Sequence, residues 1–121
     1  MSVTAKDFLD LAKSNLSENS SEMEHRNCIS RAYYSLYHAT CSSLIYCPPT
    51  THQGVINYLF SPAERKKEPF DQKILISVGA VLKQQIIKSH MADYELNKQV
   101  FKSEAESSVM AIEKTIKKLE D

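Results

Sequence analysis

The stretch from Glu24 to Ile45 places apolar residues at intervals of three and four, which is the spacing of one face of an α-helix. The apolar face comprises Ile29, Tyr33, Leu36, Tyr37 and Leu44. A second face of the same helix is polar and comprises Asn27, Arg31, Tyr34, His38 and Cys41. We therefore predict a long helix here, opened by a capping box of Ser21 with Glu24 and stopped by Pro48 and Pro49.

The same spacing predicts four more helices, over residues 5–17, 52–60, 71–88 and 103–121. Two of them begin with further capping boxes, Thr4 with Asp7 and Ser103 with Glu106. Gly79 is predicted to be a point of close packing between helices. Residues 61–69 and 93–102 are predicted loops, because they combine charges with poor helix formers.

Only two glycines and four prolines occur in 121 residues, and runs of β-branched residues are short. This composition favours an all-α protein, and the length is that of one domain over residues 1–121. The predicted architecture is an antiparallel four-helix bundle in which residues 52–60 form one short extra helix.

The charges balance, with fifteen Lys and Arg against fifteen Asp and Glu. The molecule therefore has no overall field that would attract nucleic acid or an anionic membrane, and any such partner has to be bound locally. The one dense basic cluster, Arg65 to Lys67, lies in a predicted loop and is typical of a solvated surface.

Charged residues interrupt the apolar positions at the N-terminus, and no uncharged stretch approaches the length of a membrane span. Three cysteines without metal-ligand spacing suit a reducing compartment. We expect a protein of the cytoplasm, without a membrane partner, a metal or a cofactor.

Candidate chemistry lies on the polar face of the long helix. Arg31 and His38 are within about 20° of one line along the helix and about 10 Å apart, with Tyr34 between them. A guanidinium, a phenol and an imidazole in one row can bind a phosphate, transfer protons and stack on a base.

The segment Ser30 to Ala39, SRAYYSLYHA, resembles the Arg-x-Tyr-Tyr helix of small stand-alone HEPN domains. The segments Thr51 to Val55 and Ala92 to Tyr94 and the closing amphipathic helix are similar to later parts of that family. The resemblance implies a HEPN-like antiparallel bundle that often dimerises. In active members it also implies a ribonuclease site without metal, formed by an arginine and a histidine four to six residues apart. Such members are often toxins or defence proteins, some paired with a nucleotidyltransferase antitoxin.

In active members the arginine and histidine lie at the third long helix, where this chain has Lys83, Lys88 and His90 but no arginine. Two sites are therefore open, one with Arg31 and His38 and one with Lys88 and His90. The candidate catalytic residues are Arg31, His38 and His90, and the candidate binding residues are Asn27, Tyr34, Lys88, Asp93 and Tyr94.

A structural role is the alternative for several of these residues. Arg31 and Tyr34 can form a hydrogen-bond network with Asp93, which we expect to accept from one or both. His25 and His52 stand near helix starts, where surface or capping duty is expected.

Three functions remain open: a metal-independent endoribonuclease of toxin or phage-defence type, a non-catalytic HEPN dimer that binds a protein or nucleotide, and a helical bundle unrelated to RNA. Because the long helix is rich in aromatic residues, we also expect a homodimer. RNA and an antitoxin are further expected partners of the first function.

Overall fold

The computed structural model describes residues 3–120, and within that range every regular element is a helix. The all-α prediction is thus confirmed. The elements are α1 (Ala5–Ser14), α2 (Glu22–Ser43), α3 (His52–Phe60), α4 (Pro62–Arg65), α5 (Gln72–Tyr94) and α6 (Lys102–Glu120).

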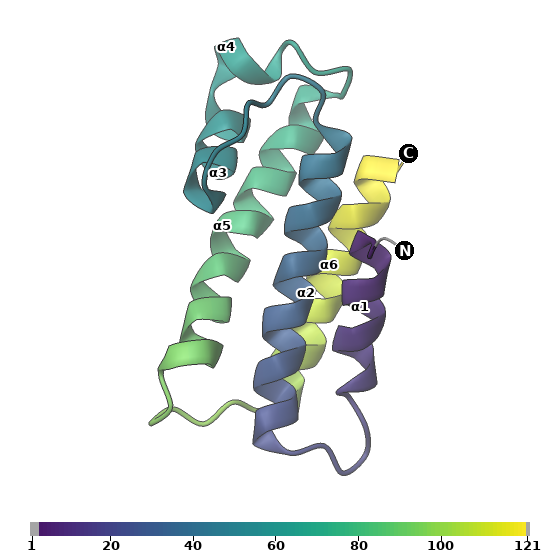
Figure 1. The fold of residues 1–121 in the computed structure, drawn as a ribbon, viewed down its shortest axis with the longest axis vertical. Helices are drawn as coiled ribbons and strands as arrows, with labels where there is room; N and C mark the ends of the chain where they lie inside the picture. Colours follow the sequence, from purple (N-terminus) through teal and green to yellow (C-terminus); the bar gives the residue numbers. More distant parts are fainter. Residues whose placement is uncertain (1–2, 121) are drawn as a thin grey trace.

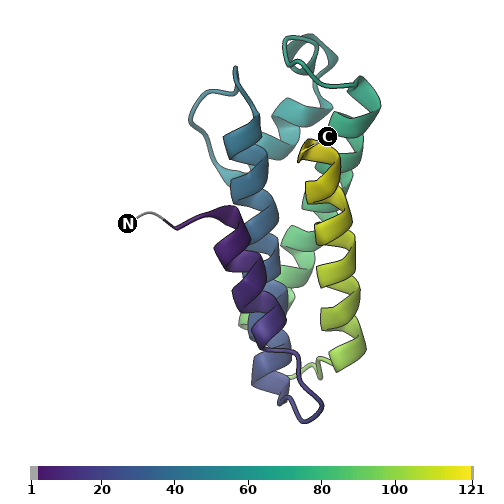
Figure 2. The same cartoon turned by 90° about the vertical axis from the view of Figure 1, so that its right-hand side faces the viewer.

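The helices α1, α2, α5 and α6 lie side by side along the long axis of the molecule (Figure 1). Helix α2 packs against each of the other three, and the view turned by 90° shows α1 and α6 flanking it (Figure 2). The short helices α3 and α4 lie at one end, where α3 packs against α5. Residues 3–120 therefore contain two short helices at this end, where the sequence predicted one.

The core is apolar and is centred on the buried face of α2. Ile29 and Leu36 are fully buried there, as are Leu75 and Leu82 on α5 and Ile112 on α6. Burying a large aliphatic side chain stabilises the fold by about 1.5–3 kcal/mol, so this shared layer is the main source of stability.

Gly79 lets α3 approach α5 closely, as predicted. A Cβ at this position would lie 3.2 Å from Leu59 Cβ and 3.3 Å from the ring of Phe60. Even a methyl group here would require Leu59 and Phe60 to shift by a few tenths of an ångström.

Two predicted capping boxes are present. Thr4 and Asp7 cap α1, and Ser21 and Glu24 cap α2, each pair with both reciprocal hydrogen bonds. Helix α1 is shorter than predicted, since Asn15 ends it by donating its side-chain amide to Leu11 O at 2.9 Å.

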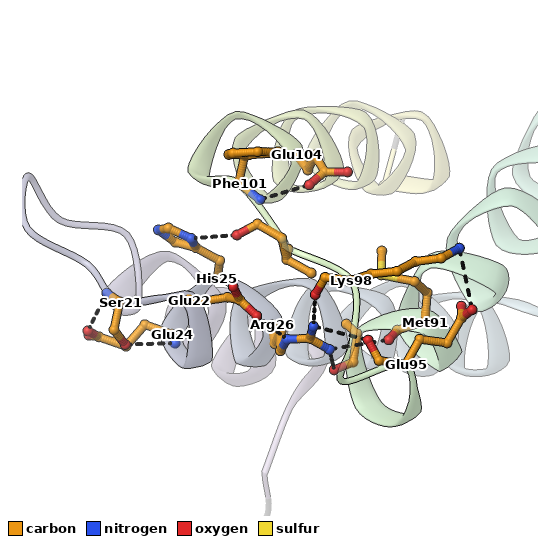
Figure 3. Close-up of polar contacts among 12 residues, drawn as sticks. Ser21, Glu22, Glu24, His25, Arg26, Met91, Glu95, Lys98, Phe101 and Glu104 are labelled. Carbon is orange, nitrogen blue, oxygen red and sulfur yellow. Dashed lines mark hydrogen bonds and ion pairs between the residues drawn. The ribbon is translucent and has the colours of Figure 1, made fainter.

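The third predicted capping box, Ser103 with Glu106, is wrong. Helix α6 begins at Lys102, so Ser103 already lies inside its first turn. The carboxylate of Glu104 instead accepts from the Phe101 N–H at 2.8 Å (Figure 3). The glutamate of the cap thus stands two residues earlier than the sequence pattern indicated.

Helix α5 runs to Tyr94, six residues beyond the predicted end at Lys88, and the cause is a buried arginine on α2. Arg26 is 3% exposed, and its guanidinium donates to the carbonyls that close α5 (Figure 3). The acceptors are Met91 O (3.4 Å), Ala92 O (2.9 Å), Glu95 O (3.1 Å) and Lys98 O. Met91 O and Glu95 O also accept from the backbone N–H groups of Glu95 (2.9 Å) and Lys98 (3.2 Å), so Arg26 adds a second donor to these two carbonyls. It also donates to Ala92 O and Lys98 O, and it thereby stabilises the last turn despite its poor helix formers.

The segment 61–69 is more ordered than the predicted loop, because it contains α4 and a buried carboxylate. Glu68 is 4% exposed and accepts three hydrogen bonds, from Ile45 N (2.8 Å), Tyr46 N (2.9 Å) and Tyr58 Oη (2.6 Å). It therefore joins the end of α2 to α3. Burial alone would raise the pKa of Glu68, but these three hydrogen bonds outweigh it and keep that pKa below its ordinary value of 4.5.

Glu68→Gln should lower the free energy of unfolding at pH 7 by about 2 kcal/mol, because a neutral amide cannot accept the three bonds of the carboxylate. The contribution is complete above pH 4.5, the ordinary pKa, and is lost as the pH falls through the lower pKa of the folded state. Urea unfolding at pH 7 and at a pH below the pKa of the folded state measures this loss, with Glu64→Gln as the surface control. A loss at pH 7 below about 0.5 kcal/mol, the range of ordinary surface changes, would contradict it.

Candidate functional site

The polar face of α2 packs against one residue of α1. The Phe8 ring centre lies 5.1 Å from that of His38, nearly parallel, and 6.2 Å from that of Tyr34. Arg31 Cζ lies 6.0 Å from the same ring. The predicted row of Arg31, Tyr34 and His38 is therefore present, and α1 supports it from one side.

Arg31 is the least satisfied of the three arginines. Its Nη2 donates to Ser30 Oγ at 3.3 Å, its Nε is buried without a hydrogen-bond partner, and its Cζ lies 4.7 Å from the Tyr34 ring centre. No carboxylate within residues 3–120 forms an ion pair with it. By contrast, Arg26 binds four carbonyls and Arg65 binds a carbonyl and Gln72 Oε1. Arg31 thus retains donors for an anionic group.

The prediction that Asp93 accepts a hydrogen bond from Arg31 or Tyr34 is wrong, although Asp93 lies near Arg31. Its Oδ2 accepts from Ser30 Oγ at 3.4 Å, and the same hydroxyl accepts from Arg31. Ser30 therefore bridges the two charged groups. No sequence pattern indicated this bridge, because a serine beside an arginine is common on helices.

Tyr34 also lines a pocket of about 440 Å³ between α2, α3 and α5. Its principal side chains are Tyr33, Tyr34, His52, Gln53, His90, Asp93 and Tyr94. The structure thereby brings four of the predicted site residues together, namely Tyr34, His90, Asp93 and Tyr94. The pocket has the size at which small-molecule sites begin.

His52 belongs to this pocket, although the sequence indicated surface or capping duty. Thr51 caps α3 instead, and the His52 ring is stacked on Tyr37 with ring centres 3.8 Å apart and planes 1° apart. His52 Nδ1 lies 2.6 Å from Tyr33 Oη. Only the packing of α3 on α2 reveals these contacts, since nineteen positions separate Tyr33 from His52.

The pKa of His52 is lowered from its ordinary value of 6.5, mainly by burial and further by the imidazoles of His38 and His90. The neutral imidazole therefore predominates at neutral pH. The imidazoles of His38 on α2 and His90 on α5 are thus close enough to influence the charge of His52 on α3.

The remaining predicted residues lie outside the pocket. His38 is on the far side of Tyr34, against Phe8, and Lys88 does not line the pocket. Asn27 donates to Asn15 Oδ1 at 3.3 Å and so connects α2 to the end of α1. His25 contacts Val100 O and Ser20 Oγ, which is a structural role at the other end of the molecule.

The cysteines offer little nucleophilic chemistry. Burial raises the pKa of Cys28 to about 11, and burial also raises the pKa values of Cys41 and Cys47. All three are thiols at neutral pH, whereas the nucleophilic form is the thiolate. Within residues 3–120, no three His, Cys, Asp or Glu side chains are grouped so that they could bind a metal ion.

In the part of the chain that the structure describes, none of the helices has the length and apolar character needed to cross a membrane. Comparisons of the chain with protein-family models, with curated proteins and with solved structures gave no significant match. The candidate site is therefore defined by its own residues and geometry.

Proposed function

We propose that this chain is a HEPN-like protein that binds RNA in the pocket beside Arg31 and cleaves it without a metal ion. The observation that carries the proposal is the Arg31 guanidinium, which has no carboxylate partner within residues 3–120 and is stacked on Tyr34. Tyr34 lines the pocket together with His52 and His90. A cation and two imidazoles are the groups that metal-free RNA cleavage requires.

In such a reaction the 2′-oxygen of the ribose forms a bond to phosphorus while the bond from phosphorus to the 5′-oxygen breaks. A base takes the proton of the 2′-hydroxyl, and an acid gives a proton to the departing 5′-oxygen. The products are a 2′,3′-cyclic phosphate and a 5′-hydroxyl. Arg31 stabilises the negative charge that grows on the phosphate oxygens.

His52 is the base in this proposal, because its lowered pKa keeps it neutral at pH 7. When Nδ1–H donates to Tyr33 Oη, the lone pair of Nε2 is available to take a proton. Tyr33 and Tyr37 fix the orientation of the ring. His90, which is exposed at the opposite wall of the pocket, is the acid.

The four long helices α1, α2, α5 and α6 support the HEPN-like four-helix bundle that the SRAYYSLYHA segment suggests. A toxin or defence role, with a nucleotidyltransferase-type antitoxin as partner, is proposed on that resemblance alone. The cytoplasm is the compartment in which such a protein would meet cellular RNA.

A non-catalytic binding module is the second candidate. Two observations favour it: the net charge is zero, and Phe8 covers the Arg31 and His38 row that resembles the family's catalytic pair. The module would bind a nucleotide or protein in the same pocket. The two candidates differ only in chemistry, so an activity measurement separates them.

We expect purified protein to cleave mixed cellular RNA at a rate that chelators do not change. His52→Ala and His90→Ala should each reduce the rate roughly a hundredfold, the usual contribution of a general base or acid. Arg31→Lys should also reduce it, since lysine keeps the charge but lacks the planar fork that binds two phosphate oxygens.

Lys66→Arg, at an exposed cation outside the pocket lining, is the control and should cleave like the parent protein. If His38→Ala abolishes cleavage while His52→Ala and His90→Ala do not, the row of Arg31, Tyr34 and His38 is the site. The assignment of the site to the pocket is then wrong. If the pure protein cleaves no RNA, the binding module replaces the enzyme.

We also propose a homodimer, but on a different surface from the one the sequence suggested. Tyr33 is buried and Tyr34 and Tyr37 are half-buried beneath α1 and α3, so the aromatic side of α2 is mostly covered. The outer face of α5 is uncovered instead, with Ile76 40% and Ile87 64% exposed. These two residues are eleven positions apart and share a helix face outside the pocket lining, and such apolar side chains favour an interface.

Light scattering at micromolar concentration should give twice the chain mass of 13.8 kDa. Ile87→Glu should convert the dimer to a monomer without unfolding it, because this side chain faces solvent in the single chain. Met110→Glu, which adds the same charge at an exposed apolar residue of α6, is the control and should leave the dimer intact. A mass near 13.8 kDa for the parent protein would contradict the dimer.

A further inference from the structure

We infer that the pocket selects guanine, with the carboxylate of Asp93 accepting hydrogen bonds from the Watson–Crick edge of the base. The inference rests on the proposed RNA-binding function but does not depend on cleavage. It is carried by the position of a largely free carboxylate on the wall of an aromatic pocket.

Asp93 has acceptor capacity to spare. Its one side-chain hydrogen bond within residues 3–120 is the long one from Ser30 Oγ, at 3.4 Å, and it takes part in no ion pair there. An ionised carboxylate has about four lone-pair positions on its two oxygens. Oδ1 and the second lone pair of Oδ2 therefore remain available to accept hydrogen bonds from a ligand.

The charges favour a base inside the pocket and the RNA backbone outside it. A carboxylate repels a phosphate, so the Asp93 side of the pocket suits a base rather than the backbone. Arg31 does not line the pocket, but its Cζ lies 4.7 Å from the ring centre of Tyr34, which does, and its guanidinium attracts a phosphate outside the pocket. A base can thus enter the pocket at Asp93 while the RNA backbone stays on the Arg31 side.

Only one of the four RNA bases complements a carboxylate along this edge. Guanine presents two neighbouring donors, the N1–H and the N2 amino group. Adenine and cytosine each place an acceptor nitrogen beside their amino group, and uracil flanks its single N–H with two carbonyl oxygens. A carboxylate would face a repelling lone pair in those three bases, but it binds both donors of guanine.

The remaining walls suit a flat ring. Tyr34 and Tyr94 line the pocket together with His90, whose ring centre lies 6.2 Å from that of Tyr94. Proteins commonly bind single-stranded bases by stacking them on such side chains while reading their Watson–Crick edges. Stacking does not distinguish the four bases, so Asp93 determines the base specificity of this pocket.

Binding of nucleoside 3′-monophosphates, measured by calorimetry, tests the inference without cleavage. The parent protein should bind guanosine 3′-monophosphate at least tenfold more tightly than the adenosine, cytidine and uridine compounds, the discrimination expected of a bidentate contact. The inosine compound keeps N1–H but lacks the amino group, so its affinity should lie between those of guanosine and adenosine.

Asp93→Asn supplies a gain of function as the sharper test. An asparagine oxygen still accepts from N1–H, but its amide donates, which suits the oxygen that xanthine carries where guanine has its amino group. The variant should therefore prefer the xanthosine compound over the guanosine compound by about tenfold. Glu95→Gln, two residues away and outside the pocket lining, should keep the parent preference.

Affinities for guanosine and adenosine within twofold in the parent protein would overturn the inference. So would an Asp93→Asn variant that weakens all the nucleotides equally, because that is the effect of a purely structural role. Cleavage of RNA without a preference for guanine would remove this inference alone. A clear guanine preference without any cleavage would support it and remove only the enzyme.

Discussion

The buried guanidinium of Arg26 is the constraint on which the rest of the molecule depends. It lies in the first turns of α2, nine-tenths or more buried, and its donors meet four backbone carbonyls at the end of α5 and in the loop that follows. Glu22 accepts from its Nε at 3.0 Å, so the charge is also paired. A buried arginine without these partners would be strongly destabilising, and its charge lies at the negative end of the helix dipole of α5. Met91 O and Glu95 O also have backbone donors, whereas Ala92 O and Lys98 O accept from the arginine. The guanidinium therefore requires the end of α5, and this fixes the position of α5 along α2.

The position of α5 determines the pocket. His90, Asp93 and Tyr94 all lie in its last two turns, which are the part that Arg26 stabilises. At the other end of α2, Glu68 binds two backbone amides of the following loop and the Tyr58 hydroxyl on α3. That second anchor places α3 so that His52 stacks on Tyr37. The buried charges of Arg26 and Glu68 thus position the three helices whose side chains line one pocket. Arg31 does not line the pocket but contacts Tyr34, and within residues 3–120 it has no carboxylate partner.

Sequence patterns correctly predicted the structural features that depend on residues close together along the chain. The all-α class, the caps at Thr4 and Ser21 and the shared face of Arg31 and His38 are all local properties, and each is present. Patterns failed where a distant residue decides the outcome. Arg26 in the first turns of a helix is usually solvated, and nothing nearby indicates that it reaches the end of α5. Ser89 to Tyr94 is a poor helix by composition, and tertiary hydrogen bonds override that preference.

The account is tested most directly by hydrogen exchange, followed by mass spectrometry, in Arg26→Lys. Lysine keeps a positive charge but presents its donors from a single nitrogen, so it cannot reach four carbonyls at once. We predict that amide protection falls roughly tenfold or more in residues 89–101 while the middle of α2 and α6 stays protected, because the fold opens locally where the carbonyls lose their donors. Protection equal to that of the parent protein across residues 89–101 would contradict the claim that Arg26 fixes the end of α5 and, with it, the pocket.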